Sequence, residues 1–379
     1  MRTIRILVTL LLICVSTSFA QTTSSPTVAF VYLGGRESEH PIRAFSLQAN
    51  GSAHLVPGSP FTTAALTDGT PQTLVAASTN FVYASDTEAI ATFRRSSNGA
   101  LTFVSSVFVT NTAIIDTLTL DRTASNLYAG GGRFENTHYF VFNKGTQGQL
   151  TAASVLPGVQ ADGELQFEHN NKFAYTTYFP FLNLPDLPGN QYCTFEAYSR
   201  TADGSLNPFD PALTRPTGVA ASDFCPASAA SSALGYLAVA YRTLDVNRFV
   251  GTGVHSIAVY RILTSGDLQF VSKLVTTLDA TLPVTMKFDP SGTFLAVAGK
   301  QGIQLYKLSS AGTLTKSGPA LYTHTNFRDV RWDRSGHVIT ISFGAVYFFG
   351  LKNGQLVQTN PPIYISFAGI RDLKVVSLQ

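Results

Sequence analysis

One stretch of the chain decides how it folds: residues 284–314 read VTMKFDPSGTFLAVAGKQGIQLYKLSSAGTL. Apolar segments of strand length alternate in it with turns that contain Gly. The expected strands are Val284–Phe288, Phe294–Ala298, Ile303–Leu308 and one that begins near Leu314. The second strand is apolar almost throughout, which suits a strand covered on both faces. The stretch therefore predicts a sheet of four antiparallel strands.

The hairpin between the third and fourth strands of this stretch recurs along the chain. Each copy has an aromatic residue and, six positions later, a Gly that supplies the positive φ angle of a tight turn. The seven pairs are Phe45/Gly51, Phe93/Gly99, Phe142/Gly148, Tyr198/Gly204, Tyr260/Gly266, Tyr306/Gly312 and Phe348/Gly354. They follow one another at steps of roughly 42 to 62 residues. Such a repeat predicts seven sheets of the same kind.

A second turn precedes this hairpin within the units. Residues 288–292 read FDPSG and residues 332–336 read WDRSG, each between a strand with alternating polarity and an apolar strand. Leu120-Asp121-Arg122-Thr123-Ala124 is a looser copy. Seven units of four antiparallel strands are the pattern of propeller blades. We therefore expect an all-β protein, a seven-bladed β-propeller.

The two ends of the repeat predict how the ring closes. The first unit begins directly on a second-strand pattern, Val28–Tyr32, and lacks a first strand. Near the C-terminus, Ile370–Val375 repeats the first strand of the seventh unit, Phe327–Trp332, position by position. We expect the C-terminal strand to complete blade one, which leaves no open edge at the seam.

The first twenty residues have the layout of a secretory signal peptide. A basic start with Arg2 and Arg5 precedes an apolar run, and small residues lead to cleavage after Ala20. The alternative is an uncleaved anchor. We expect residues 1–20 to be the signal peptide, 21–26 a short leader and 27–379 a single propeller domain. The mature chain then lies in the periplasm or outside the cell, with no membrane span.

The charge balance restricts the partners of the mature chain. Removal of the signal takes away two of the 26 basic residues and none of the 23 acidic ones, which leaves a net charge of +1. Such a chain, with no run of Lys and Arg, is not expected to bind nucleic acid or an anionic membrane. We expect a monomer whose ligand is a small molecule, a glycan or a protein, bound at the central funnel.

Two cysteines remain after processing, Cys193 and Cys225. In an oxidising compartment they are candidates for a disulfide, and the alternative is two separate buried thiols. No pattern of a catalytic nucleophile or a phosphate-binding loop is present, and the seven His residues are scattered singly. The sequence therefore predicts neither a metal nor another cofactor.

The candidate site residues lie where the innermost strands begin. Arg328-Asp329 and Arg371-Asp372 stand in neighbouring blades, and His324 precedes the first pair. Glu164 and Asp223 take comparable positions in blades four and five. Neighbouring residues of a strand point to opposite faces, so neither Arg can simply neutralise the Asp beside it. Because blades seven and one are adjacent, the Arg of one blade and the Asp of the other have two possible roles. They pair across the seam, or they line a central ligand funnel.

The repeat units resemble the lactonase family of seven-bladed propellers, whose namesake is 6-phosphogluconolactonase. The resemblance rests on Phe288–Val297 and on the hairpin Ser310–Leu314, and it covers the whole mature chain. It implies hydrolysis of a sugar lactone. The family's Pro-Arg-His lead is altered, because Asp329 and Asp372 stand where His is expected.

Lactone hydrolysis needs a base and a donor to the oxyanion. Glu164 is the candidate base, and Arg328 or Arg371 is the candidate donor. Because no His matches a catalytic position, the leading interpretation is an exported ligand-binding or interaction module. The alternative is a hydrolase of a sugar lactone or a related cyclic ester.

Overall fold

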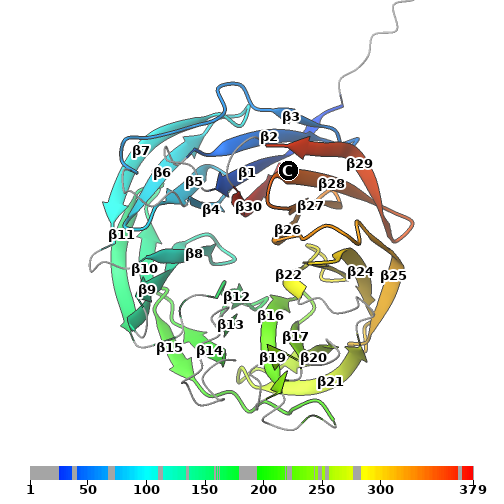
Figure 1. Cartoon of the computed structure of the whole chain (residues 1–379). Coiled ribbons are helices and arrows are strands. Elements are labelled where there is room, and N and C mark those ends of the chain that lie inside the picture. Colours follow the sequence, from blue (N-terminus) through cyan, green and yellow to red (C-terminus); the bar gives the residue numbers. More distant parts are fainter. Residues whose placement is uncertain are drawn as a thin grey trace, which may run out of the picture.

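The computed structural model describes residues 25–35, 41–66, 73–109, 114–133, 136–157, 159, 161, 163–178, 194–217, 219, 224–242, 244–245, 250–251, 256–275, 283–365 and 369–378. In these residues every regular element is a β-strand. No helix long and apolar enough to cross a membrane is found in this part of the chain. The strands form seven four-stranded antiparallel sheets, arranged as blades around a common centre (Figure 1). The predicted all-β, seven-bladed propeller is confirmed.

Each blade begins with an innermost strand at the centre of the ring and continues outwards. Blade one contains β30 (Ile370–Ser377), β1 (Thr27–Gly35), β2 (Arg43–Gln48) and β3 (Ala53–Leu55). Blade two contains β4 (Leu74–Ala77), β5 (Phe81–Ser85), β6 (Ala89–Arg95) and β7 (Leu101–Phe108). Blade three contains β8 (Ile115–Leu120), β9 (Asn126–Arg133), β10 (Asn136–Lys144) and β11 (Leu150–Pro157). Blade four contains β12 (Gln166–Phe167), β13 (Phe173–Tyr178), β14 (Thr194–Arg200) and β15 (Leu206–Phe209).

The remaining blades follow the same plan. Blade five contains β16 (Cys225–Ser231), β17 (Tyr236–Arg242), β20 (Ser256–Ile262) and β21 (Leu268–Val275). Blade six contains β22 (Pro283–Phe288), β23 (Phe294–Gly299), β24 (Gly302–Leu308) and β25 (Leu314–Leu321). Blade seven contains β26 (Asp329–Trp332), β27 (His337–Ile341), β28 (Ala345–Lys352) and β29 (Gln355–Tyr364). A two-stranded ribbon, β18 (Leu244–Asp245) with β19 (Val250–Gly251), is inserted in blade five and was not predicted.

The ring closes as the ends of the repeat predict. Strand β30 pairs antiparallel with β1, with Val375 opposite Val31 and Leu373 opposite Leu33. The C-terminal strand therefore lies at the centre of the ring, between β4 and β26 (Figure 1). Ile370 and Leu373 are fully buried there, so the last strand of the chain belongs to the core.

The seven predicted hairpins join the blades to one another. All seven turn glycines have φ between +75° and +94°, and all seven aromatic residues are buried. In blades one to four, a Tyr of the second strand donates its hydroxyl to the turn-glycine carbonyl of the next blade. These bonds are Tyr32–Gly99 at 2.9 Å, Tyr83–Gly148 at 3.2 Å, Tyr128–Gly204 at 2.7 Å and Tyr175–Gly266 at 2.7 Å. The hairpin thus ends one blade and binds the blade before it.

Candidate functional site

The innermost strands present two sets of side chains to the centre of the ring. Strand register makes Thr285, Asp329 and Asp372 equivalent in blades six, seven and one. Two residues later, on the same face of each strand, stand Lys287, Arg331 and Lys374. Three consecutive blades therefore direct a cation toward the same central space, each with a polar or acidic side chain on the same face.

A cavity of about 170 Å³ lies at the end of the ring where the innermost strands begin. Its lining residues come from blades one to four, six and seven: Leu74, Asp116, Thr117, Leu118, Glu164, Thr285, Arg328, Asp329, Arg331, Arg371, Asp372 and Lys374. Five of the seven predicted Arg, Asp, Glu and His candidates are brought together in this cavity. A cavity of this volume suits a small ligand.

Glu164 of blade four contacts all three central cations. Its carboxylate lies 2.8 Å from Lys287 Nζ, 3.0 Å from Arg331 Nη1 and 3.7 Å from Lys374 Nζ. Gln166 accepts a further hydrogen bond from Lys287 Nζ at 2.9 Å. Burial opposes ionisation of Glu164, but the charges of Arg331, Lys287 and Lys374 outweigh it and hold its pKa well below the usual range. Glu164 is therefore an ion-pair partner and a poor general base.

The two aspartates do not pair with the arginines that precede them in the sequence. Asp329 Oδ2 lies 2.9 Å from Arg331 Nη2, and Asp372 Oδ1 lies 3.1 Å from Lys374 Nζ. The expected alternative of pairing between Arg328 or Arg371 and the Asp of the adjacent blade is wrong. Each Asp is paired instead with the cation two residues later in its own strand, which alternation places on the same face and within reach.

Backbone contacts hold the two aspartates in place. Asp372 Oδ2 accepts a hydrogen bond from Val75 N of blade two at 2.9 Å, which joins the seam to the next blade. Asp329 Oδ1 accepts one from Val330 N at 2.8 Å and another from the Thr285 hydroxyl at 3.3 Å. Burial raises the pKa of Asp329 above its usual range, against the charges of Arg331 and Lys374. Asp329 is therefore better suited than Glu164 to accept a proton.

Arg328 and Arg371 line the same cavity without a carboxylate partner among the described residues. The Nε of Arg371 is buried and has no hydrogen-bond partner within the described part of the chain. The Arg328 guanidinium lies 5.0 Å from the centroid of the Phe343 ring, and Phe343 is itself 55% exposed. These two arginines are the cations of the site that remain available to a ligand.

The other predicted site residues do not reach the cavity or lie outside the described part of the chain. His324 is exposed in the segment before β26 and does not line the cavity. Asp223 and Cys193 lie outside the described residues. Cys225 is disulfide-bonded, and its pairing with Cys193 stays a prediction. Among the described residues, no group of three or more His, Cys, Asp and Glu is placed to hold a metal ion.

Sequence reasoning missed the three central cations. Lys287, Arg331 and Lys374 each stand two residues after the polar position at the start of the innermost strand in blades six, seven and one. The signal was present in the aligned turns, because Lys287 and Arg331 each precede the aromatic residue of the FDPSG and WDRSG motifs. A lone Lys or Arg in a strand is ordinarily solvated, so its position alone did not indicate a site.

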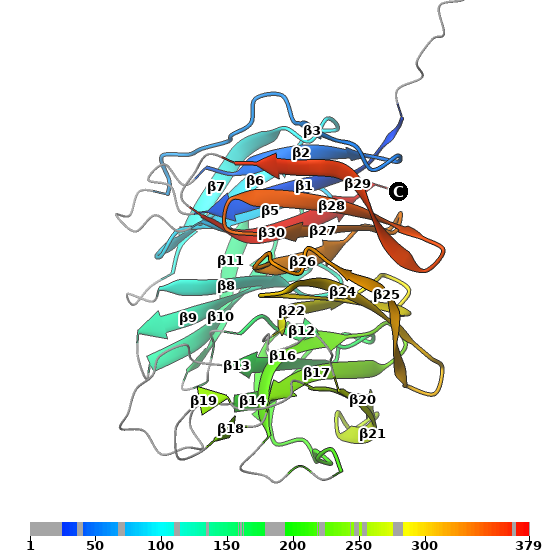
Figure 2. The same ribbon diagram turned by 45° about the vertical axis from the view of Figure 1, so that its right-hand side comes forward.

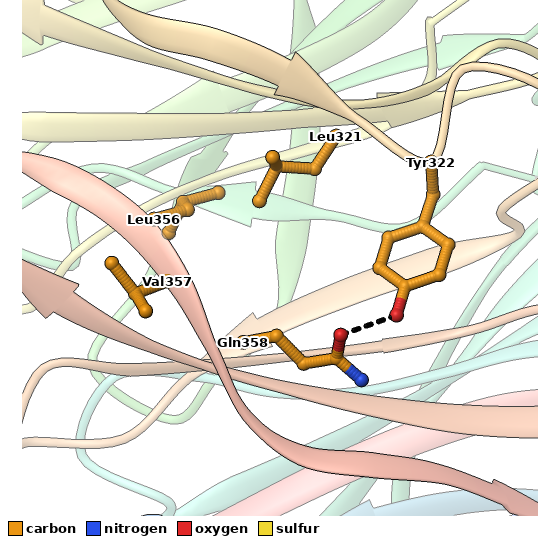
Figure 3. A pocket seen from close by; sticks show the side chains of 5 residues that line it. All are labelled: Leu321, Tyr322, Leu356, Val357 and Gln358. Carbon is orange, nitrogen blue, oxygen red and sulfur yellow. Dashed lines mark hydrogen bonds between the residues drawn. The ribbon is translucent and has the colours of Figure 1, made fainter.

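A second, larger cavity is lined by residues in and next to β25 and β29, the outermost strands of blades six and seven. Figure 2 shows these two strands on the right-hand side of the molecule. This cavity measures about 340 Å³ and is lined by Leu321, Tyr322, Leu356, Val357 and Gln358. Figure 3 shows the Tyr322 hydroxyl directed at Gln358 Oε1, 2.6 Å away. No lining residue carries a charge, and the Tyr322 ring packs edge-on against Tyr347. Because charged side chains from several blades line the central cavity and none lines the outer one, the central cavity is the candidate site.

Comparison with solved structures places this arrangement among known propellers. Two proteins described as putative 6-phosphogluconolactonases superpose on the chain with a TM-score of 0.63 and 15% identity. The superposition with the Bacteroides uniformis protein includes 93% of this chain and all of that protein. The superposition with the Bacteroides fragilis protein includes 92% of this chain and 98% of that protein. The chain has the fold of these lactonase-like propellers. The resemblance found in the repeat units is thus confirmed for the fold.

The comparisons leave the chemistry of the site open. A functionally unknown protein from Desulfotomaculum acetoxidans has a TM-score of 0.55 and 12% identity, with 93% of this chain covering all of it. No protein-family model and no curated protein matches the sequence. One propeller fold hosts many activities, so the function must be argued from the cavity itself.

Proposed function

We propose that this chain binds a small hydroxylated organic acid, of the sugar-acid kind, in the central cavity of an exported propeller. The observation that carries the proposal is the pair Arg328 and Arg371, which line the cavity and form no ion pair with the described residues. A guanidinium presents parallel N–H donors that match a carboxylate. Two such groups beside one small cavity favour an anionic ligand.

The aspartates of the cavity suit the hydroxyl groups of that ligand. Asp329 and Asp372 are hydrogen-bond acceptors with their positions set by backbone N–H groups, and a sugar hydroxyl donates to such oxygens. A ligand with a carboxylate at one end and hydroxyls along its length then satisfies both kinds of group. The volume of about 170 Å³ favours a single sugar acid over a longer chain.

The proposal is tested by titration calorimetry on residues 21–379, with gluconate as the ligand and glucose as its neutral counterpart. We expect gluconate to bind, and Arg371→Gln and Arg328→Gln each to weaken it about tenfold or more, as loss of a charge-assisted hydrogen bond does. Arg334→Gln, an exposed Arg at the opposite end of blade seven, is the matched control. Equal binding of glucose and gluconate, or unchanged affinity in Arg371→Gln, would contradict the proposal.

Hydrolysis of a sugar lactone is the second candidate, and Asp329 is the residue that favours it. Its raised pKa and its place in the cavity suit a general base, with Arg328 or Arg371 stabilising the oxyanion. The same preparation is assayed for gluconolactone hydrolysis above the rate in buffer. Activity that falls about a hundredfold in Asp329→Asn and is lost in Arg328→Ala would establish the enzyme. If gluconolactone is hydrolysed no faster than in buffer, the lactonase function is rejected and the binding function is retained.

A further inference from the structure

The three central cations lie within paired strands, whereas the carboxylate between them does not. Lys287, Arg331 and Lys374 lie within paired strands, opposite Ala296, Ile339 and Tyr32 respectively. Arg331 Nε also donates to Leu373 O at 3.0 Å, and Trp332 Nε1 donates to Lys287 O at 2.9 Å. These contacts fix the backbone of the three cations and the direction of the Arg331 side chain independently of Glu164.

Glu164 is attached differently. Strand β12 begins at Gln166, and only Gln166 and Phe167 pair with β13, so Glu164 precedes the strand and has no partner in the sheet. Its side chain is 28% exposed, against 13% to 16% for the three cations, and it lines the cavity. Rotation of this side chain therefore breaks no strand pairing and exposes the cations to the cavity.

The charges of the cluster show what Glu164 supplies. Arg331 is paired with Asp329, and Lys374 is paired with Asp372. Lys287 pairs with Glu164 and with no other carboxylate of the described residues. Without Glu164, the buried cluster holds three cations and two carboxylates. One negative charge placed between Lys287, Arg331 and Lys374 restores neutrality, and in the native chain Glu164 provides it.

We propose that Lys287, Arg331 and Lys374 form an oxyanion-binding site that Glu164 occupies as an internal stand-in. The site takes a carboxylate or phosphate group, which binds when the Glu164 side chain turns out toward the cavity. Glu164 is then a specificity-determining residue, since only an anion that competes with a tethered carboxylate gains the three cations. This site lies in the same cavity as Arg328 and Arg371 but uses three other cations, so it does not depend on the function proposed for those arginines.

The test is rescue of a Glu164 variant by added anions, measured as the thermal midpoint Tm of residues 21–379. Glu164→Ala opens the site and leaves one excess positive charge. We expect acetate, as the carboxylate probe, and inorganic phosphate, as the phosphate probe, to raise its Tm by about 3 °C or more at a hundred times the dissociation constant. Chloride at the same ionic strength is expected to raise it less. The wild type and Glu88→Ala, an exposed Glu in blade two, are the controls.

Three outcomes decide the proposal. A larger rise in Glu164→Ala than in both controls supports it, and the stronger of the two probes names the ligand group. An equal rise in all three proteins reflects binding at Arg328 and Arg371 or general salt stabilisation, and it overturns the internal site alone. If Glu164→Ala does not fold, Glu164→Gln carries the same excess charge with nearly the original volume. Absence of any specific rise in that variant also overturns the proposal.

Discussion

At the centre of this ring, burial determines the direction of the pKa shift of Lys287, whereas neighbouring charges determine that of Glu164. Burial lowers the pKa of Lys287 to about 8, even though Glu164 lies 2.8 Å away. The carboxyl of Glu164, with three cations around it, shifts to a lower pKa instead. The lysine has one carboxylate partner, whereas the glutamate has three cationic ones. The cluster is therefore more sensitive to loss of Glu164 than to loss of any single cation.

The stabilising effect of Glu164 should disappear in acid. An unfolded Glu has a pKa of about 4.3 and the folded Glu164 has a lower one, so the unfolded chain binds more protons as the pH falls. The contribution is complete above about pH 5 and is lost as the pH falls through the folded pKa. Loss of a partly exposed ion pair costs about 1–3 kcal/mol. We expect the Tm of Glu164→Gln to be below wild type at pH 7 and this difference in Tm to narrow as the pH falls below about 5, toward the lowered pKa of the folded Glu164. A difference that stays constant with pH would show that charge is not the cause.

At the scale of elements, the turn glycine of each hairpin has two separate functions. Gly99 has φ +88°, and a Cβ added to it would lie 2.4 Å from the Phe30 ring of the preceding blade. Its carbonyl also accepts the hydroxyl of Tyr32. Gly99→Ala should therefore destabilise the protein by about 2–5 kcal/mol, from backbone strain and overpacking together. Gly344→Ala is the matched control, because nothing lies within 4 Å of its Cβ, and it should change stability by about 0.5 kcal/mol or less. Urea denaturation measures both, and equal effects would refute this role of the turn.

The same hairpins explain why the fold was predictable and the site only partly so. A positive φ at Gly99 or Gly148 requires a particular residue type, so the repeat is written into the sequence. The central ion pairs need no particular local conformation. Glu164 and Lys287 are 123 residues apart, and only the closed ring brings them within 2.8 Å of each other. The alternation of the strand predicts that Arg328 and Arg371 do not pair with the Asp beside them, whereas the convergence of three blades on Glu164 needed the structure.

For the whole molecule, closure and the site depend on the same strand. Strand β30 supplies the innermost strand of blade one, and it also supplies Arg371, Asp372 and Lys374 to the cavity. Asp372 bonds to Val75 N of blade two on one side, and Leu373 O accepts a hydrogen bond from Arg331 of blade seven on the other. The seam is thus held by the residues that line the cavity, so ligand binding and ring closure should stabilise each other.

Removal of residues 370–379 should therefore open the ring and destroy the site together. The deletion exposes core partners of Ile370, Leu373 and Val376, whose burial contributes roughly 1.5–3 kcal/mol each. We expect the Tm to fall by about 10 °C and gluconate binding to be lost, whereas deletion of Gln379 alone should have little effect. A synthetic peptide of residues 369–379, added in trans, should restore both properties by pairing with β1. Full thermal stability in the truncated chain would contradict closure by β30. The last arm of the test uses a peptide that carries Asp372→Asn and Lys374→Gln. If it restores the Tm but not gluconate binding, the strand closes the ring and these two side chains contribute to the site.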